Sequence, residues 1–237
     1  NSLTNFISFN KSETLKQSFK IFILYTLLTL FIFILLNIFD IRVFNSLNLA
    51  MSVVSSGGFL PTNSLSNILI NNPQMIIFSL LMLTSFFSIF LIYNLIVLRN
   101  RNLNFFNEDL HLLFYFLFLL IIFLIFFNFN NNFISLLLSL TSSVSNIGFS
   151  LEETSNNLSF VFLIIVIIGG SFFSTSSGIR LLKIYFLFRH SLNEILSYSK
   201  PHNIYTTKFH LIDSNIEQQD INKYFVSVLI FIISLFI

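Results

Sequence analysis

The chain has 237 residues, of which 55% are hydrophobic and 9% charged, and its formal net charge is +2. Soluble globular domains carry roughly 25% charged residues, so this composition excludes an ordinary soluble domain and indicates an integral membrane protein. The sequence has no Cys, which excludes disulfides and thiolate chemistry, and its 4 His show no metal-ligand spacing.

Long apolar runs predict several membrane-spanning helices, because a span needs about 20 mostly apolar residues. In chain order these helices are expected at 19–39, 75–98, 110–127 and 158–189, with the start of a further one at 223–237. The run at 158–189 is broken by GGSFFSTSSG at 169–178. The chain lacks an initial Met and stops inside an apolar run, so we expect a fragment of a longer protein.

Two further apolar segments, 43–56 and 133–147, are too short and too rich in Ser and Asn to span. Segments of this kind are typical of re-entrant structure, whose irregular backbone is tolerated at membrane depth only inside protein or beside water. Each segment leads into a Gly-Phe pair and is followed by a long apolar run. Both are therefore expected to enter the membrane and turn back.

Basic residues predict the orientation. Of the 12 Lys and Arg, all but Arg42 fall before the first helix, in its first turn, between helices two and three, or after the break at 169–178. The positive-inside rule then places the N-terminus, the joint at 99–109 and the linker at 190–222 in the cytoplasm. Glu152 and Glu153 lie on the outer side, near the second re-entrant segment.

An internal repeat relates the two re-entrant segments. With a shift of 90 residues, SVVSSGGF at 52–59 lies on SSVSNIGF at 142–149, with five identical positions. Such a repeat defines the architectural unit. The unit is an outer helix, a pore helix, a loop and an inner helix.

This unit is suited to conducting a cation, because a short extended segment with Gly at the turn can aim successive backbone carbonyls at a dehydrated ion. The predicted filter residues, which act mainly through backbone carbonyls, are Ser55, Ser56, Gly57, Gly58, Ser145, Asn146, Ile147 and Gly148. The alternative is that both Gly-Phe segments are ordinary external turns.

These motifs resemble the Trk/Ktr/HKT superfamily of potassium transporters, most closely the bacterial Trk potassium-uptake membrane subunit. Filter segments in that family are rich in small hydroxyl residues and end in Gly-Phe. The family's third inner helix is interrupted by a small-residue loop, and GGSFFSTSSGIR is similar to it, with Phe172, Phe173 and Ser177 as departures. The resemblance implies an all-α integral membrane fold of tandem helix–pore loop–helix repeats in a pseudo-fourfold, cation-channel-like transporter.

The resemblance also implies a division of the chain. The second repeat would cover 1–98, with outer helix 19–39, pore helix and filter 43–60 and inner helix 75–98. After a cytoplasmic joint at 99–109, the third repeat would cover 110–189, with outer helix 110–127, pore helix and filter 133–150 and broken inner helix 158–189. A cytoplasmic linker at 190–222 would lead to 223–237, the truncated first helix of a fourth repeat.

The function implied is potassium uptake across a bacterial plasma (inner) membrane, with K⁺ at the filter residues and no covalently bound cofactor. The implied gate is the interrupted loop, comprising Gly169, Gly170, Ser171, Ser174, Thr175, Ser176, Ser177 and Gly178. Arg180 and Lys183 are expected on one face of the resumed helix, at the inner mouth. Expected partners are a second copy of the chain, a cytosolic nucleotide-binding regulatory subunit and the lipid bilayer, without nucleic acid.

Several alternatives stay open. The alternatives to a K⁺ transporter are a Na⁺-conducting relative of the same fold, a non-transporting membrane subunit, and the product of a degenerate gene fragment. A separate alternative for the interrupted loop is a static kink with a packing role, and one for Arg180 and Lys183 is that both are anchors at the cytoplasmic interface. A membrane enzyme using His111 or Ser174 is a further alternative, but no acid, base and nucleophile converge at a recognisable spacing.

Overall fold

The computed structural model describes residues 11–88, 103–126, 133–151, 156–171, 174–198 and 218–236. The elements are α1 (Lys11–Ile38), α2 (Val43–Ser55), the 3₁₀ turn η1 (Leu65–Asn67), α3 (Asn72–Phe86), α5 (Leu103–Phe126), α6 (Phe133–Ser145), α7 (Asn156–Ile167), β1 (Ile168–Gly169), β2 (Ile179–Arg180), α8 (Leu181–Tyr198) and α9 (Gln218–Phe236). Residues 99–102, Glu152, Glu153, Phe172, Phe173 and 199–217 lie outside the described residues.

Most of the predicted helices are present, with changed bounds. The helix expected at 110–127 begins at Leu103, and the helix expected from 223 begins at Gln218. The segment at 190–222, expected as a linker, is helical at its start because α8 continues to Tyr198. The run expected at 75–98 is not one continuous helix, since α3 ends at Phe86 and Phe87 has extended backbone.

One of the described helices, over Ser18–Ile38 of α1, is long and apolar enough to cross a membrane. Other described apolar stretches are shorter, including Asn72–Phe86 and Asp109–Ile125. Only 22% of the α1 window is buried, and large apolar side chains such as Phe22 and Phe31 are exposed along it. A continuous exposed apolar surface of this kind marks contact with lipid or with another protein.

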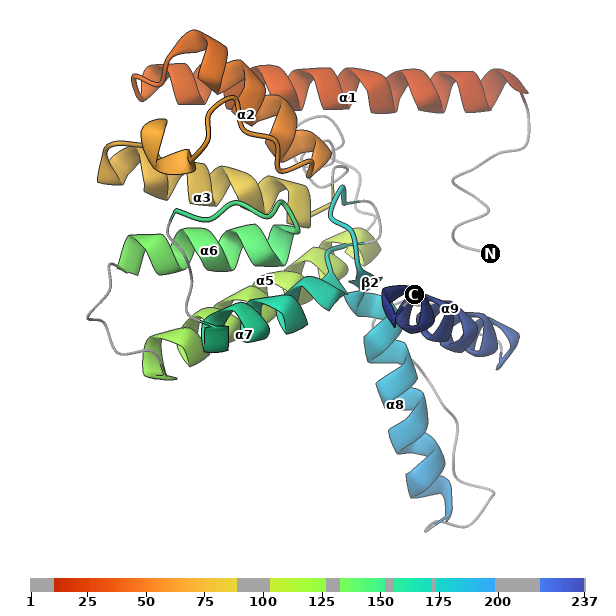
Figure 1. Ribbon diagram of the computed structural model, residues 1–237. Helices are drawn as coiled ribbons and strands as arrows, with labels where there is room; N and C mark the ends of the chain where they lie inside the picture. The colour runs from red at the N-terminus through yellow and green to blue at the C-terminus, as the bar shows by residue number, and fades with distance from the viewer. Residues whose placement is uncertain are drawn as a thin grey trace.

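Helices α1, α2, α3, α5, α6 and α7 form a layered bundle (Figure 1). Helix α2 packs beside α1, and α3 packs along α6, so that α3 and α6 lie at the centre of the bundle. Helix α5 and helix α7 lie on the far side of α6 from α1. The segment joining α2 to α3 folds back over α3 through η1.

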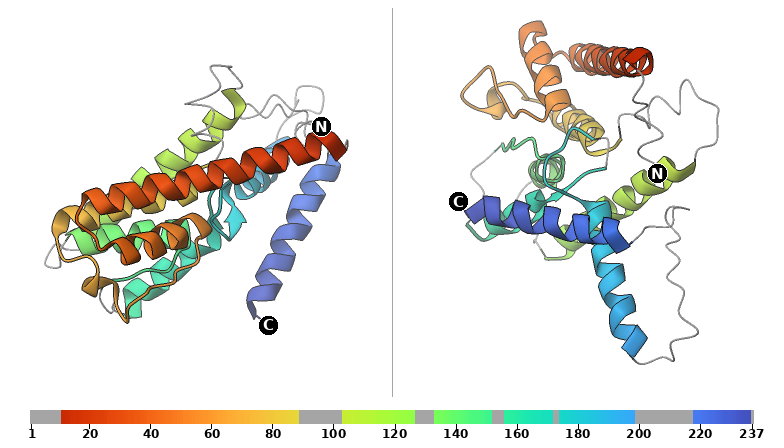
Figure 2. Two further views of the ribbon diagram at one scale, coloured as in Figure 1. Left: turned by 90° about the horizontal axis from the view of Figure 1, so that it is seen from above. Right: turned by 90° about the vertical axis from the view of Figure 1, so that its right-hand side faces the viewer.

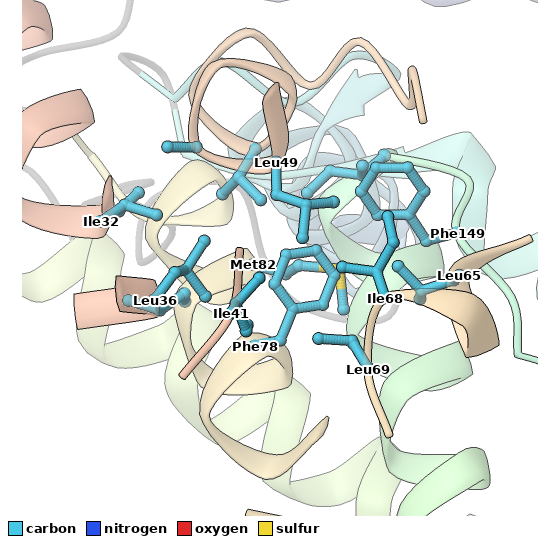
Figure 3. Packing of buried hydrophobic residues seen from close by; sticks show 14 of the residues in the cluster. Ile32, Leu36, Ile41, Leu49, Leu65, Ile68, Leu69, Phe78, Met82 and Phe149 are labelled. Carbon is cyan, nitrogen blue, oxygen red and sulfur yellow. The ribbon is translucent and has the colours of Figure 1, made fainter. Parts of the chain in front are cut away.

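Two apolar cores meet at the α3–α6 pair. The first joins α1, α2, η1 and α3 and receives Leu138, Ile147 and Phe149 from α6 and the loop after it. In Figure 3, Phe149 lies among Leu65, Ile68 and Phe78. The second core joins α5, α6 and α7 and receives Phe86 from α3. Each repeat therefore inserts side chains into the core of the other, which holds the two repeats together.

Helices α8 and α9 extend outside this bundle, with α9 crossing the beginning of α8 (Figure 2). The Lys183 ammonium donates to Ser227 Oγ at 3.2 Å. The rings of Phe186 and Tyr224 stack with centroids 6.3 Å apart. These contacts attach α9 to the first turns of α8.

Candidate functional site

The two predicted pore helices are equal in length, and the offset between them is the same as that of the sequence repeat. Helix α2 covers Val43–Ser55 and α6 covers Phe133–Ser145, each with 13 residues. Both ends of α6 therefore lie 90 residues after the corresponding ends of α2. We call residues 56–60 the α2 loop and residues 146–150 the α6 loop.

Both helices end in the same hydrogen-bonded cap. After α2, Gly57 N–H donates to Ser52 O at 2.9 Å and Ser56 N–H donates to Val53 O at 3.2 Å. After α6, the corresponding bonds run from Ile147 N–H to Ser142 O at 3.1 Å and from Asn146 N–H to Ser143 O at 3.2 Å. This is the Schellman motif, which requires a left-handed residue just after the helix.

Left-handed residues occur at the first and third positions of both loops. Ser56 has φ 51° and Gly58 has φ 67°, while Asn146 has φ 59° and Gly148 has φ 87°. A left-handed residue reverses the rotation between neighbouring peptide planes, so this alternation turns successive carbonyls to one side of a loop and successive N–H groups to the other. A row of carbonyls on one side is the geometry that coordinates a dehydrated cation.

The two loops touch at Gly58. A Cβ added there would lie 2.2 Å from the carbonyl oxygen of Ile147, whereas a Cβ added at Gly148 would meet nothing within 4 Å. The sequence placed these segments 90 residues apart and related them only by similarity. The fold brings their backbones into contact.

The interruption of the third inner helix is a loop that leaves the helix and returns to it. Strand β1 pairs in parallel with β2, with Ile168 opposite Ile179, so the chain resumes beside the point where it left. The resumed helix was expected from 179, but residues 179 and 180 are in β2 and α8 begins at Leu181. We call residues 170–178 the interruption loop.

The interruption loop accounts for the early end of α3. Ser171 N–H donates to Phe86 O at 3.1 Å, and Ser176 N–H donates to Ser85 O at 3.2 Å. These carbonyls would otherwise bond to the next turn of a continuing helix. Gly170 lies against the same helix end, where a Cβ would be 2.3 Å from Phe86 O.

Hydroxyl groups satisfy much of the loop's own backbone. Gly170 N–H donates to Ser176 Oγ at 2.8 Å, and Ser174 Oγ donates to Ser171 O at 2.8 Å. Ser174 Oγ and Ser176 Oγ are 3.0 Å apart. Irregular backbone at membrane depth requires such internal partners, which explains why this segment is rich in Ser.

The interruption loop contacts the same repeat position in both capped loops. Ser56 Oγ lies 3.2 Å from Thr175 Oγ1, and Asn146 Nδ2 donates to Ser177 O at 2.7 Å. Ser56 and Asn146 are the two left-handed cap residues. The residues predicted as filter and as gate therefore form one connected site, which local sequence patterns did not indicate.

Arg180 and Lys183 do not act as a pair. The Arg180 guanidinium donates to Ser171 O and, at 3.0 Å, to Ser174 Oγ, whereas Lys183 reaches Ser227 on α9. The expectation that both lie on one helix face is wrong, because Arg180 is in β2 and precedes the helix. Arg180 instead holds the interruption loop in its folded form.

Asp109 is 3% exposed and was not among the residues predicted for the site. Its Oδ1 accepts the N–H of Ser88 at 2.9 Å, just beyond the end of α3, so the carboxylate joins α5 to the end of α3. The sequence feature that could have indicated a role for Asp109 is the position of its carboxylate at the start of a long apolar run. Among the described residues, no cluster of three or more His, Asp or Glu side chains is arranged to hold a metal.

Two repeats of helix, pore helix and loop, together with an interrupted inner helix, define the class of protein: the chain has the fold of a pseudo-fourfold, potassium-channel-like transporter. One solved structure to which the chain is similar is the crystal structure of the potassium transporter TrkH from Vibrio parahaemolyticus, with a TM-score of 0.75 and 17% sequence identity. The match covers 93% of this chain and 49% of the TrkH chain, so the sequence spans about half the length of that protein. Comparison of the sequence with family models and with curated proteins gives no match.

Proposed function

We propose that this chain is part of a Trk-type membrane transporter that takes up K⁺. The α2 and α6 loops, each with the last residue of the helix before it, would supply two of the carbonyl-lined segments of a selectivity filter, through residues 55–58 and 145–148. The observation that carries the proposal is the alternation of left-handed residues in both loops, at positions related by the repeat. The cap already accounts for the left-handed residues at 56 and 146, so Gly58 and Gly148 are the positions that distinguish a carbonyl row from an ordinary helix end.

The interruption loop would gate the pathway. Its contacts with Ser56 and Asn146 support this role, because the loop lies directly against the two proposed filter segments. Movement of the loop would break two hydrogen bonds to those segments and release Arg180 from the loop carbonyls.

The filter is tested in the full-length parent protein, expressed in a host that lacks K⁺ uptake. Gly58→Asp and Gly148→Asp place a carboxylate among the carbonyls and should abolish most K⁺ uptake. Asn63→Asp is the matched control, since it adds the same charge on an exposed residue a few positions after the α2 loop. Unchanged uptake in Gly58→Asp and Gly148→Asp variants that reach the membrane at the parent level would show that these loops are not the filter.

Competition distinguishes the proposed K⁺ transporter from a Na⁺-conducting relative. We expect Rb⁺ uptake by the parent protein to be inhibited by K⁺ and little affected by Na⁺. Strong inhibition by Na⁺, with Na⁺ uptake lost in Gly58→Asp, would assign the filter to Na⁺. No uptake of either ion by a well-inserted parent would favour a non-transporting subunit.

The proposal includes a bacterial inner-membrane location with a cytoplasmic N-terminus, supported by the distribution of Lys and Arg. Because this sequence has no Cys, single Cys residues at Phe105 and His210 can be labelled selectively. Both should react only from the cytoplasmic side, and labelling from opposite sides would contradict the topology. A homodimer and a cytosolic nucleotide-binding subunit are proposed on resemblance alone, and co-purification of the tagged parent tests both.

A further inference from the structure

Two buried hydroxyls without partners occupy the same position in the two repeats. Ser52 on α2 is 4% exposed and Ser142 on α6 is 2% exposed. The Oγ atoms of both lack a hydrogen-bond partner. The identical residues at this position, 90 apart, make the same local arrangement twice.

Neighbouring hydroxyls on these helices behave differently. Each of the following donates to a carbonyl three or four residues earlier in its own helix: Ser46 and Ser55 on α2, and Ser139, Thr141, Ser143 and Ser145 on α6. That bond is the usual solution for a Ser inside a helix. Ser52 and Ser142 are turned away from it, which leaves both hydroxyls available for another partner.

The same part of the structure leaves backbone donors without acceptors. The N–H groups of Gly58, Phe59, Gly148 and Phe149 make no hydrogen bond within the described residues. Of these residues Phe149 is buried, at 3% exposed, Gly58 is half-buried, and Phe59 and Gly148 are exposed. With left-handed residues alternating in each loop, we expect these N–H groups to face away from the carbonyl side. Buried donors and hydroxyls are nearly always paired, with protein or with ordered water.

We propose that a buried water molecule binds behind each capped loop, one at Ser52 and one at Ser142. The Ser hydroxyl hydrogen-bonds to the water, and the water accepts an N–H of the following loop. Ser52 O and Ser142 O already accept the cap N–H groups of Gly57 and Ile147, so each Ser lies directly beneath its loop. The water would support the backbone of the loop from the side opposite its carbonyls.

The proposed water sites are tested by whether removing the Ser hydroxyl raises or lowers the melting temperature. This measurement does not involve ion transport, so a failure of the water proposal is distinguishable from a failure of the proposed function. A buried hydroxyl that has no partner destabilises a protein, and its removal is neutral or stabilising. Removal of a hydroxyl that holds a water leaves the water and the loop N–H incompletely paired. We therefore expect Ser142→Ala in the purified full-length parent to lower the melting temperature, on the order of 1–2 °C.

Ser143→Ala is the matched control, because Ser143 is also buried but its hydroxyl donates to Leu140 O within the helix. Its melting temperature should stay close to that of the parent. Ser52→Ala should lower the melting temperature as Ser142→Ala does, and the double variant should show the sum of the two shifts. An unchanged or raised melting temperature in both single variants would overturn the proposal.

A high-resolution structure of the full-length parent provides the direct measurement. It should contain an ordered water within hydrogen-bond distance of Ser52 Oγ and another at Ser142 Oγ, and Ser142→Ala should lose only the second. If both hydroxyls instead donate to the carbonyls of Asn48 and Leu138, four residues earlier, with no water beside them, the proposal is wrong.

Discussion

Phe59 and Phe149 hold the same position in two repeats of one sequence, yet 80% of Phe59 and 3% of Phe149 are exposed. Phe149 packs against Phe78 of α3, with ring centroids 5.7 Å apart. The loops that carry the two residues have the same cap and the same alternation of left-handed residues. The loop conformation is therefore set within each repeat, whereas the burial of the Phe side chain depends on which neighbouring element packs against the loop.

The contact at the glycines shows the same distinction. Gly58 lies against Ile147 O, while Gly148 has open space where a Cβ would lie. The α6 loop is thus packed against a side chain of α3, through Phe149, whereas the α2 loop is packed against the backbone of the α6 loop, through Gly58. In the part of the chain that is described, the two loops are equivalent in conformation and different in what constrains them.

The largest difference is expected at the two Phe residues. Phe149→Ala removes a buried ring from the first core and should cost about 3–5 kcal/mol of stability, whereas Phe59→Ala should stay within about 0.5 kcal/mol. Denaturant unfolding of the purified full-length parent in detergent measures both. Equal losses would mean that Phe59 is buried under those conditions and that the contrast between the loops is wrong.

A smaller difference is expected at the glycines. Gly148→Ala forces a left-handed Ala without a clash and should cost roughly 1–2 kcal/mol. Gly58→Ala should cost more, because its Cβ also meets the carbonyl oxygen of Ile147. The same unfolding measurement ranks the two variants, and a larger loss in Gly148→Ala would contradict the contact between the loops.

The smallest effects are expected at the contacts with the interruption loop. Asn146→Ser gives the α6 loop the residue of the α2 loop and removes the bond to Ser177 O, and Thr175→Val removes the contact with Ser56. Each should cost about 1 kcal/mol. Hydrogen exchange of the backbone N–H groups at 174–178 should become faster in both variants, and slower or equal exchange would show that these bonds do not hold the loop.

Local patterns predicted much of the secondary structure. The start of α2 at Val43, the start of α6 at Phe133 and a helix break near Ile168, one residue after the end of α7, follow from apolar periodicity, Ser and Asn content, and the pairs of Gly. The internal repeat related Gly58 to Gly148, and both have positive φ. These features depend on residues close in sequence, which is why sequence reasoning found them.

Besides the shifted helix bounds, three features that sequence patterns predicted wrongly or did not indicate depend on long-range contacts. The run at 75–98 appeared continuous, but the interruption loop takes the carbonyls of Ser85 and Phe86 and α3 ends there. Arg180 and Lys183 appeared to share one helix face, but the pairing of β1 with β2 keeps Arg180 outside the helix. Asp109 had no visible role until the end of α3 was placed beside it.

By itself, the sequence determined the membrane class, the repeated helix-and-loop unit and the positions at which the backbone turns, because composition, periodicity and Gly act over a few residues. Only the tertiary structure decided that the α2 loop, the α6 loop and the interruption loop form one site, since Ser56 and Thr175 are 119 residues apart. No local propensity specifies such a contact. It arises when α3 and α6 pack together and bring the ends of both helices to the same place.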